Sequence, residues 1–423
     1  MRELKVFIEI KGQEILVGHI EGEDYKDAVF QYDREYLNSS DSRAISVTFP
    51  LREESFSPGE TRNFFEGLLP EGFSRRAVAE WIKTDEKDYL TILVELGKEC
   101  LGALKVIEGD NEYDASYEKI SLEEVRQLAA EGATKSTKIL LDTHLSLTGA
   151  SGKVGLYYDA ANKEWYLPKG SAPSTHIVKQ SHVRLKGLVL NEQLCTKAAG
   201  LVGIDVPDSF IINLGRGSDS EVLFASERYD RRMSDKLLNG LRRPYRLHQE
   251  DFAQALGIAS ANKYEHEKSG YLKRVFELLR MRFANPIEDQ TKLLRIIVFN
   301  YLIGNTDSHI KNYSLLYDER VESLRLAPAY DLVSTMIYGT SGRMSMYYGD
   351  ELELSGIKRS TFGDVAREVG LAEAFVYSVF DDVAGKLESA LSTAAEELEQ
   401  TGFDDAIATG KTVLEVGGYR YID

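Results

Sequence analysis

The pattern of apolar and polar positions predicts a small mixed domain at the start of the chain. Residues 4–19 alternate between apolar and polar side chains on either side of Lys11-Gly12-Gln13, which predicts a β-hairpin with its turn there. Strand and short-helix patterns follow, so we expect an α+β domain over residues 1–107. The acidic segment 108–142 predicts a linker that opens into a helix capped by Ser121.

The rest of the chain divides into a β-rich part and a helical part. Short strand patterns dominate residues 143–245, with one helical stretch among them, and helical spacing of apolar residues dominates residues 246–423. This succession predicts a two-lobed α+β architecture. A ligand of such a protein is expected to bind between the lobes.

One polar stretch separates two apolar segments of the helical part. An apolar run ends at Gly304, a polar run follows, and apolar residues resume at Tyr313. Within the polar run, Asp307 and Asn312 have the D-x-x-x-x-N spacing of kinase catalytic loops, in which the aspartate orients the acceptor hydroxyl and the asparagine binds magnesium. Asp331 is the candidate second carboxylate. The spacing alone is also compatible with a helix cap and a turn residue.

Two upstream features are candidates for a nucleotide site. The segment "SLTGASGK" puts Gly149 and Gly152 in a loop between strands, where backbone N–H groups can hold phosphates, although the pattern is not a Walker A motif and also fits a hairpin turn. Lys179 lies in an apolar strand and either faces solvent or provides a charge for α- and β-phosphates, held by Glu192.

Composition and charge narrow the functional class. The 423 residues are 43% hydrophobic and carry a formal net charge of −17, so we do not expect the chain to bind nucleic acid by itself. The two cysteines are far apart and predict no disulfide framework. Neither a signal peptide nor a membrane-spanning run is visible, and we expect a cytoplasmic protein.

Taken together, these motifs resemble the HipA family of serine/threonine-kinase toxins from type II toxin–antitoxin modules. The segments that carry the resemblance are "FFEGLLPEGFSRR", "SLTGASGK", "HIVKQS", "NEQLCTKAAGLVGIDVPDS", "SERYDR", "LHQEDFAQALG", "GNTDSHIKNYSLL" and "APAYDL". The resemblance implies a PI3/4-kinase-like two-lobed fold that follows a separate N-terminal domain. It also implies transfer of the γ-phosphoryl group of ATP to a protein serine, with magnesium bound.

The resemblance further implies roles for individual residues. Asp307 is the expected catalytic aspartate, and Asn312 and Asp331 are the expected magnesium ligands. His309 and Lys311 are expected to shape the catalytic loop or to contact the γ-phosphate. The expected nucleotide-binding residues are Gly149, Ala150, Ser151, Gly152, Lys153, Lys179, Glu227 and Tyr229, with Glu192 in support. Ser146 matches the serine that the family autophosphorylates. Ser151 and Gly152 depart from the family's usual G-A-Q-x-K phosphate loop.

The biological role implied by the resemblance is growth arrest through phosphorylation of an aminoacyl-tRNA synthetase or another translation factor. A small helix-turn-helix antitoxin similar to HipB would be the partner, and DNA would be contacted only through it. Two alternatives stay open at this point. One is a small-molecule phosphotransferase, because antibiotic kinases share the D-x-x-x-x-N spacing, and the other is a catalytically silent co-repressor subunit.

Overall fold

The computed structural model describes residues 2–97, 100–109, 114–125, 153–181, 185–215 and 221–422. The chain forms two compact units. Unit 1 contains residues 1–183, 225–260 and 316–323, and unit 2 contains residues 184–224, 261–315 and 324–423. The boundaries 1–107, 108–142, 143–245 and 246–423 expected from the sequence stay a prediction.

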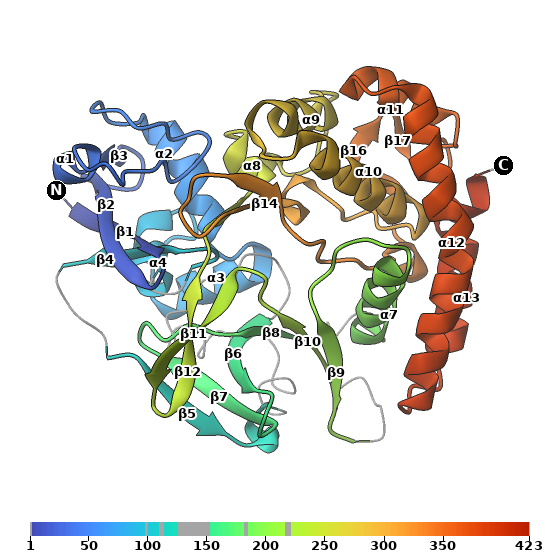
Figure 1. Cartoon of the computed structure of the whole chain (residues 1–423), viewed down its shortest axis with the longest axis horizontal. Coiled ribbons are helices and arrows are strands. Elements are labelled where there is room, and N and C mark those ends of the chain that lie inside the picture. Colours follow the sequence, from blue (N-terminus) through green and yellow to red (C-terminus); the bar gives the residue numbers. More distant parts are fainter. Residues whose placement is uncertain are drawn as a thin grey trace. The chain divides into compact units, whose positions relative to one another are not determined.

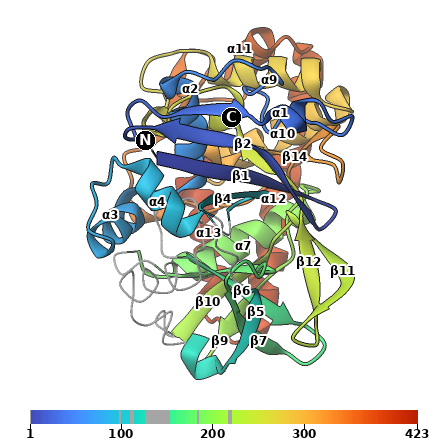
Figure 2. The same ribbon diagram turned by 90° about the vertical axis from the view of Figure 1, so that its left-hand side faces the viewer.

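Unit 1 begins with an antiparallel sheet in the order β3-β2-β1-β4, of which Figure 2 shows β2, β1 and β4 side by side. Its strands are β1 (Arg2–Ile10), β2 (Gln13–Gly22), β3 (Val29–Tyr32) and β4 (Leu104–Glu108). Ile10 pairs with Gln13, so Lys11 and Gly12 form a two-residue turn, and both have the positive φ of a type I′ hairpin. The predicted hairpin is therefore confirmed.

Short helices complete this part of unit 1. They are α1 (Arg34–Leu37), α2 (Pro58–Phe65), η1 (Glu66–Leu68), α3 (Gly72–Trp81) and α4 (Tyr89–Leu96). Ser57 caps α2 with a capping box. The Ser57 hydroxyl accepts from the backbone N–H of Glu60, and the Glu60 carboxylate accepts from the backbone N–H of Ser57. Phe30 packs against the buried rings of Phe49 and Phe65, which gives this sheet an aromatic core.

A second sheet follows in unit 1, with strands in the order β5-β7-β6-β8, and β10 continues it past β8. The strands are β5 (Ser116–Ile120), β6 (Lys153–Asp159), β7 (Glu164–Lys169), β8 (His176–Gln180) and β10 (Val222–Glu227), which begins in unit 2. Strand β5 lies within the stretch that the sequence predicted as a linker. Ser121 follows it and accepts a hydrogen bond from the Glu124 N–H, as expected of a cap.

The remaining elements of unit 1 follow β10. They are the hairpin β11 (Arg231–Leu238) and β12 (Leu241–Arg246), strand β13 (Gln249–Asp251), helix α8 (Phe252–Ala255) and η3 (Ser260–Asn262), which ends in unit 2. The sequence did not predict the β11–β12 hairpin.

Unit 2 is mainly helical, and its long helix α12 (Glu373–Gln400) packs against four other helices (Figure 1). These are α7 (Leu188–Leu201), α10 (Pro286–Leu302), α11 (Thr361–Val369) and α13 (Ala406–Val416). The other elements are α9 (Tyr271–Arg282), η4 (Ile310–Asn312), η5 (Met336–Tyr338), η6 (Gly418–Tyr421), β9 (Ser209–Asn213), β14 (Ser314–Tyr317, which ends in unit 1), β15 (Leu324–Leu326), β16 (Arg343–Tyr348) and β17 (Glu351–Glu353). Within the described part of the chain, no helix has the length and apolarity to cross a bilayer.

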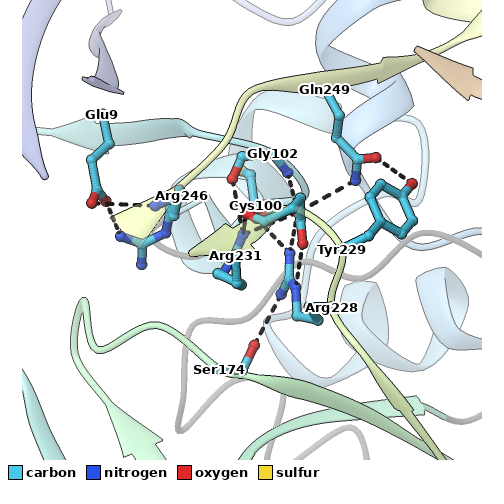
Figure 3. Close-up of polar contacts among 10 residues, drawn as sticks. Glu9, Cys100, Gly102, Ser174, Arg228, Tyr229, Arg231, Arg246 and Gln249 are labelled. Atoms are coloured by element: carbon cyan, nitrogen blue, oxygen red, sulfur yellow. Dashed lines mark hydrogen bonds and ion pairs between the residues drawn. The ribbon is translucent and has the colours of Figure 1, made fainter. Parts of the chain in front are cut away.

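A cluster of charged side chains is buried in unit 1 just after β10 (Figure 3). Asp230 accepts from Nε and Nη2 of Arg228 at 2.9 and 2.8 Å, and Nη1 of Arg231 lies 3.0 Å from Oδ2 of Asp230. Its Oδ2 also accepts from the backbone N–H of Gly102 at 2.8 Å. Burial alone would raise the pKa of Asp230, but the two guanidinium groups and these hydrogen bonds hold it well below its usual range.

The pKa of a second buried carboxyl group, Glu250 on β13, is shifted in the opposite direction. Its Oε2 is 2.6 Å from the Ser46 hydroxyl, and its Oε1 accepts from the Val47 N–H at 2.9 Å and from the Tyr317 hydroxyl at 2.6 Å. Burial raises the pKa of Glu250 to about 7 in spite of these hydrogen bonds, and the neighbouring charge of Asp251 adds to the rise. The Ser46 hydroxyl donates to Oε2, so the raised pKa comes from burial and not from these hydrogen bonds.

We expect Glu250→Gln to stabilise unit 1 at alkaline pH, because glutamine reproduces the neutral acid. The folded state holds the Glu250 proton more tightly than the unfolded state, so this contribution is complete below about pH 4.5 and is lost as pH rises through about 7. The difference in unfolding free energy between variant and wild type should grow to about 3 kcal/mol at pH 8. Urea unfolding followed by tryptophan fluorescence measures it, since both tryptophans, Trp81 and Trp165, lie in unit 1.

Other groups near Glu250 do not obscure this difference. Burial lowers the pKa of His248 to about 4, so His248 costs stability as pH falls below about 6.5, and it does so equally in both proteins. Burial raises the pKa of Tyr32, so its hydroxyl stays neutral over this range. The exposed Glu54→Gln is the matched control and should show no such trend. A difference that stays constant from pH 5 to pH 8 would contradict the prediction.

Candidate active site

The polar run after α10 begins at Gly304, a position where the backbone conformation and the close neighbours require glycine. Gly304 has φ +69°, and a β-carbon there would lie 2.8 Å from Cγ of Met336 and 3.0 Å from Cα of Gly417. Its carbonyl accepts from the backbone N–H groups of Thr335 and Met336 at 3.1 and 3.2 Å. The end of α10 is therefore fastened to the segment that follows Asp331.

Asn305 connects the two loops in which the expected catalytic and metal-binding residues lie. Its side chain is buried, and Nδ2 donates to Oδ1 of Asn300 at 2.9 Å and to the backbone carbonyl of Asp331 at 3.1 Å. Its Oδ1 accepts from the backbone N–H of Asp307 at 3.3 Å. Sequence reasoning gave Asn305 no role, and the only signal was its place in a polar run between buried segments.

Asp307 and Asn312 are brought together by the short helix η4. Nδ2 of Asn312 donates to the backbone carbonyl of Asp307 at 2.8 Å, which leaves the Asn312 amide oxygen as the atom able to bind a cation. The Asp307 side chain is exposed and therefore accessible to an acceptor. Asp331 has φ +53°, a conformation that non-glycine residues adopt rarely and that is often found at functional sites.

Further hydrogen bonds hold the two loops against neighbouring elements. The Tyr330 hydroxyl donates to the backbone carbonyl of Lys311 at 3.0 Å and lies 2.6 Å from the Ser314 hydroxyl. Asn191 on α7 donates to the Ser334 carbonyl at 2.9 Å and accepts from the Ser334 N–H at 3.1 Å. Sequence reasoning missed both Tyr330 and Asn191, because these contacts join distant positions.

His309 and Lys311 lie inside unit 2 rather than on its surface. Both side chains are buried, and the His309 ring packs edge-on against Tyr264, with centroids 5.3 Å apart. Their roles, to shape the loop or to contact the γ-phosphate, stay predictions.

The donor atoms of Asn312 and Asp331 are of the kind that magnesium binds. Both provide oxygen, and Mg²⁺ usually takes one or two carboxylates together with phosphate oxygens and water. In the part of the chain that the structure describes, no group of three or more His, Cys, Asp or Glu residues is arranged to hold a metal ion. The side-chain oxygens of Asn312 and Asp331 fit a magnesium ion that phosphate oxygens and water also bind.

The two expected nucleotide-binding lysines are direct neighbours in unit 1. Lys153 on β6 is paired with Lys179 on β8, so both side chains are on the same face of the sheet. Two lysines on one face make that part of the sheet locally basic, which favours an anion there. Ser146 and residues 149–152, which complete the expected phosphate loop, lie outside the described residues.

Glu227 and Tyr229 are the sequence neighbours of Arg228, which belongs to the buried charged cluster described above. Glu227 ends β10 with an exposed side chain, and the Tyr229 hydroxyl donates to Oε1 of Gln249 (Figure 3). Because Arg228 and Asp230 are fixed, the backbone between Glu227 and Tyr229 is fixed as well. Glu192 is buried on α7 in unit 2, whereas Lys179 belongs to unit 1, so their pairing stays a prediction.

Comparison with known proteins gives the same family over nearly the whole chain. The model of the HipA-like C-terminal domain matches residues 145–391, and that of the HipA N-terminal domain matches residues 8–107. The putative kinase Y4mE of Sinorhizobium fredii is 31% identical over 401 residues, which are 92% of each protein. The serine/threonine-protein kinase toxin HipA of Shewanella oneidensis is 27% identical over 395 residues, 89% of this chain and 87% of that protein.

A solved structure shows the same fold. It is the complex of Shewanella oneidensis HipA with HipB and operator DNA, in which HipA matches with a TM-score of 0.80 and 24% identity, over 99% of this chain and 97% of that one. This likeness confirms the predicted two-lobed, kinase-like α+β fold. By sequence and by fold, the chain belongs to the HipA family of kinases.

Proposed function

We propose that this protein is an ATP- and magnesium-dependent serine/threonine protein kinase that acts as a growth-arresting toxin. The observation that carries the proposal is the joining of two loops through Asn305, which brings the Asp307 backbone and the Asp331 backbone to one side chain. Asn312 is bonded to the same loop. An acceptor-orienting carboxylate and two oxygen ligands thus lie on connected backbone, as phosphoryl transfer needs.

In this mechanism the acceptor serine hydroxyl attacks the γ-phosphorus of ATP. The new O–P bond forms as the bond to the β–γ bridging oxygen breaks, ADP leaves, and the hydroxyl proton passes to the Asp307 carboxylate. Asn312 and Asp331 would hold magnesium, which neutralises charge on the β- and γ-phosphates when bound. His309 and Lys311 support the loop from inside.

The nucleotide would be held by residues of unit 1. The cross-strand pair of Lys153 and Lys179 supports a phosphate site, because two lysines on one face of the sheet attract an anion. The loop 149–152 would supply backbone N–H groups, and Glu227 and Tyr229 would hold adenine through their backbone. Glu192 would orient Lys179.

The proposed targets follow from the resemblance to the family, and the proposed partner follows from a solved relative. Ser146 is the proposed autophosphorylation site, and an aminoacyl-tRNA synthetase or another translation factor is the proposed substrate. Shewanella HipA was solved with HipB and operator DNA, which supports a HipB-like antitoxin as partner, with DNA reached through it. The net charge of −17 agrees with this division of roles, since a basic partner would supply the phosphate contacts.

The proposal is tested by measuring the intact mass of the protein after incubation with ATP and magnesium and then mapping the phosphorylated residue. Wild type should gain one phosphoryl group at Ser146, Ser146→Ala should not gain it there, and a chelator should prevent it. Purified aminoacyl-tRNA synthetases are then offered as acceptors to Ser146→Ala. Absence of phosphate on the chain and on every acceptor would overturn the proposed function.

A further inference from the structure

A tyrosine from a segment distant in sequence contacts the carboxylate of Asp307. The Tyr264 hydroxyl donates to Oδ1 of Asp307 at 2.6 Å, a short hydrogen bond typical of a charged acceptor. The same ring packs edge-on against buried His309, at an interplanar angle of 83°. Both contacts lie within unit 2, and Tyr264 itself is half-buried.

The backbone next to Tyr264 is fixed by a buried glutamate. Oε1 of Glu265 accepts from the backbone N–H groups of Ser269 and Tyr271 at 2.7 and 3.1 Å, so it also caps the start of α9. Its Oε2 accepts from the Tyr347 N–H on β16 at 3.0 Å. Three backbone donors on one buried carboxylate leave this segment little freedom to move.

Ser345 on β16 links this segment to the loop that carries Asp307. Its carbonyl accepts from the Glu265 N–H at 2.9 Å, and its hydroxyl donates to the Thr306 carbonyl at 2.6 Å. The residue after Tyr264 and the residue before Asp307 are therefore bonded to the same serine. The distance between phenol and carboxylate is set by this arrangement rather than by the two side chains alone.

We propose that Tyr264 is a positioning residue, which holds the Asp307 carboxylate in the rotamer needed for phosphoryl transfer; this inference rests on the proposed function. The Asp307 side chain is exposed and would otherwise sample several rotamers. With Oδ1 bound to the phenol, Oδ2 is the oxygen that receives the proton of the acceptor hydroxyl. A carboxylate accepts both hydrogen bonds at once, so Tyr264 need not leave when the acceptor binds.

The test compares Tyr264→Phe with wild type in the rate of autophosphorylation at a series of ATP concentrations. Loss of one hydrogen bond to a charged group should lower the maximal rate roughly tenfold, with the half-saturating ATP concentration unchanged. Replacing Tyr264 by 4-aminophenylalanine, which keeps a donor at the same position, should restore most of the rate. Tyr377→Phe, on α12 in the same unit, is the matched control and should match wild type.

Each other outcome contradicts the inference in a recognisable way. A faster Tyr264→Phe variant would mean that the phenol competes with the acceptor, and phosphate mapped to Tyr264 would mean that it is itself an acceptor. Equal rates for wild type and Tyr264→Phe would overturn the positioning role and leave the proposed kinase intact. A wild-type chain that transfers no phosphate to itself or to any acceptor would overturn the proposed function instead.

Discussion

Replacing Asp307 by asparagine is expected to slow phosphoryl transfer by about 10²–10⁴-fold, the usual contribution of a positioned general base. Asparagine has the same shape, and its amide oxygen can still accept from Tyr264. The backbone carbonyl of residue 307 still accepts from Asn312. The substitution therefore removes the proton-accepting carboxylate and little else. The rate of mass gain with ATP and magnesium measures the effect.

Asp404→Asn provides the matched control for this variant. Asp404 is exposed between α12 and α13 in the same unit, so its substitution removes one charge without touching the candidate site. We expect it to keep the wild-type rate. Thermal unfolding followed by circular dichroism should be the same for all three proteins. An Asp307→Asn variant as active as Asp404→Asn would show that another group accepts the proton.

The elements that local patterns encode were predictable from the sequence. The first hairpin and helices α9 to α12 have clear periodicities, and the structure has helices or strands at these places. Charged residues obscure the strand alternation of the β11–β12 hairpin. Its turn, Asn239-Gly240, is nevertheless a strong hairpin signal, and both residues have positive φ, so the hairpin could have been found.

The candidate site was predictable only where its parts lie in one stretch of sequence. Asp307 and Asn312 share a loop, and their spacing reveals the relation between them. The contacts made by Tyr264 and Asn191 join residues 43 and 143 positions apart, and no local pattern encodes such pairs. The neighbouring positions of Lys153 and Lys179 likewise follow from strand register, which was not evident from either segment alone.

Asp230→Asn should be the most destabilising of the single substitutions considered for unit 1, at about 3–5 kcal/mol. The variant leaves the buried guanidinium groups of Arg228 and Arg231 without their carboxylate partner. The NH₂ group of the new asparagine would also face the backbone N–H of Gly102 or the arginine N–H groups, and a donor facing a donor forms no hydrogen bond. Urea unfolding by tryptophan fluorescence reports on the correct unit, because Trp81 and Trp165 both belong to it.

Two further variants show whether unpaired buried charge causes the loss of stability in Asp230→Asn. Asp235→Asn also removes a carboxylate that pairs with an arginine, Arg242, but this pair lies on the surface of the β11–β12 hairpin. We expect no measurable change in the urea midpoint for this exposed pair. The double variant Arg228→Met, Asp230→Asn removes charge of both signs and should recover part of the loss, since the remaining excess is one arginine instead of two. The loss of unfolding free energy in the double variant could instead equal the sum of the losses in the two single variants. The loss would then come from packing, and the charge balance of the cluster would not be what stabilises the segment between β10 and β11.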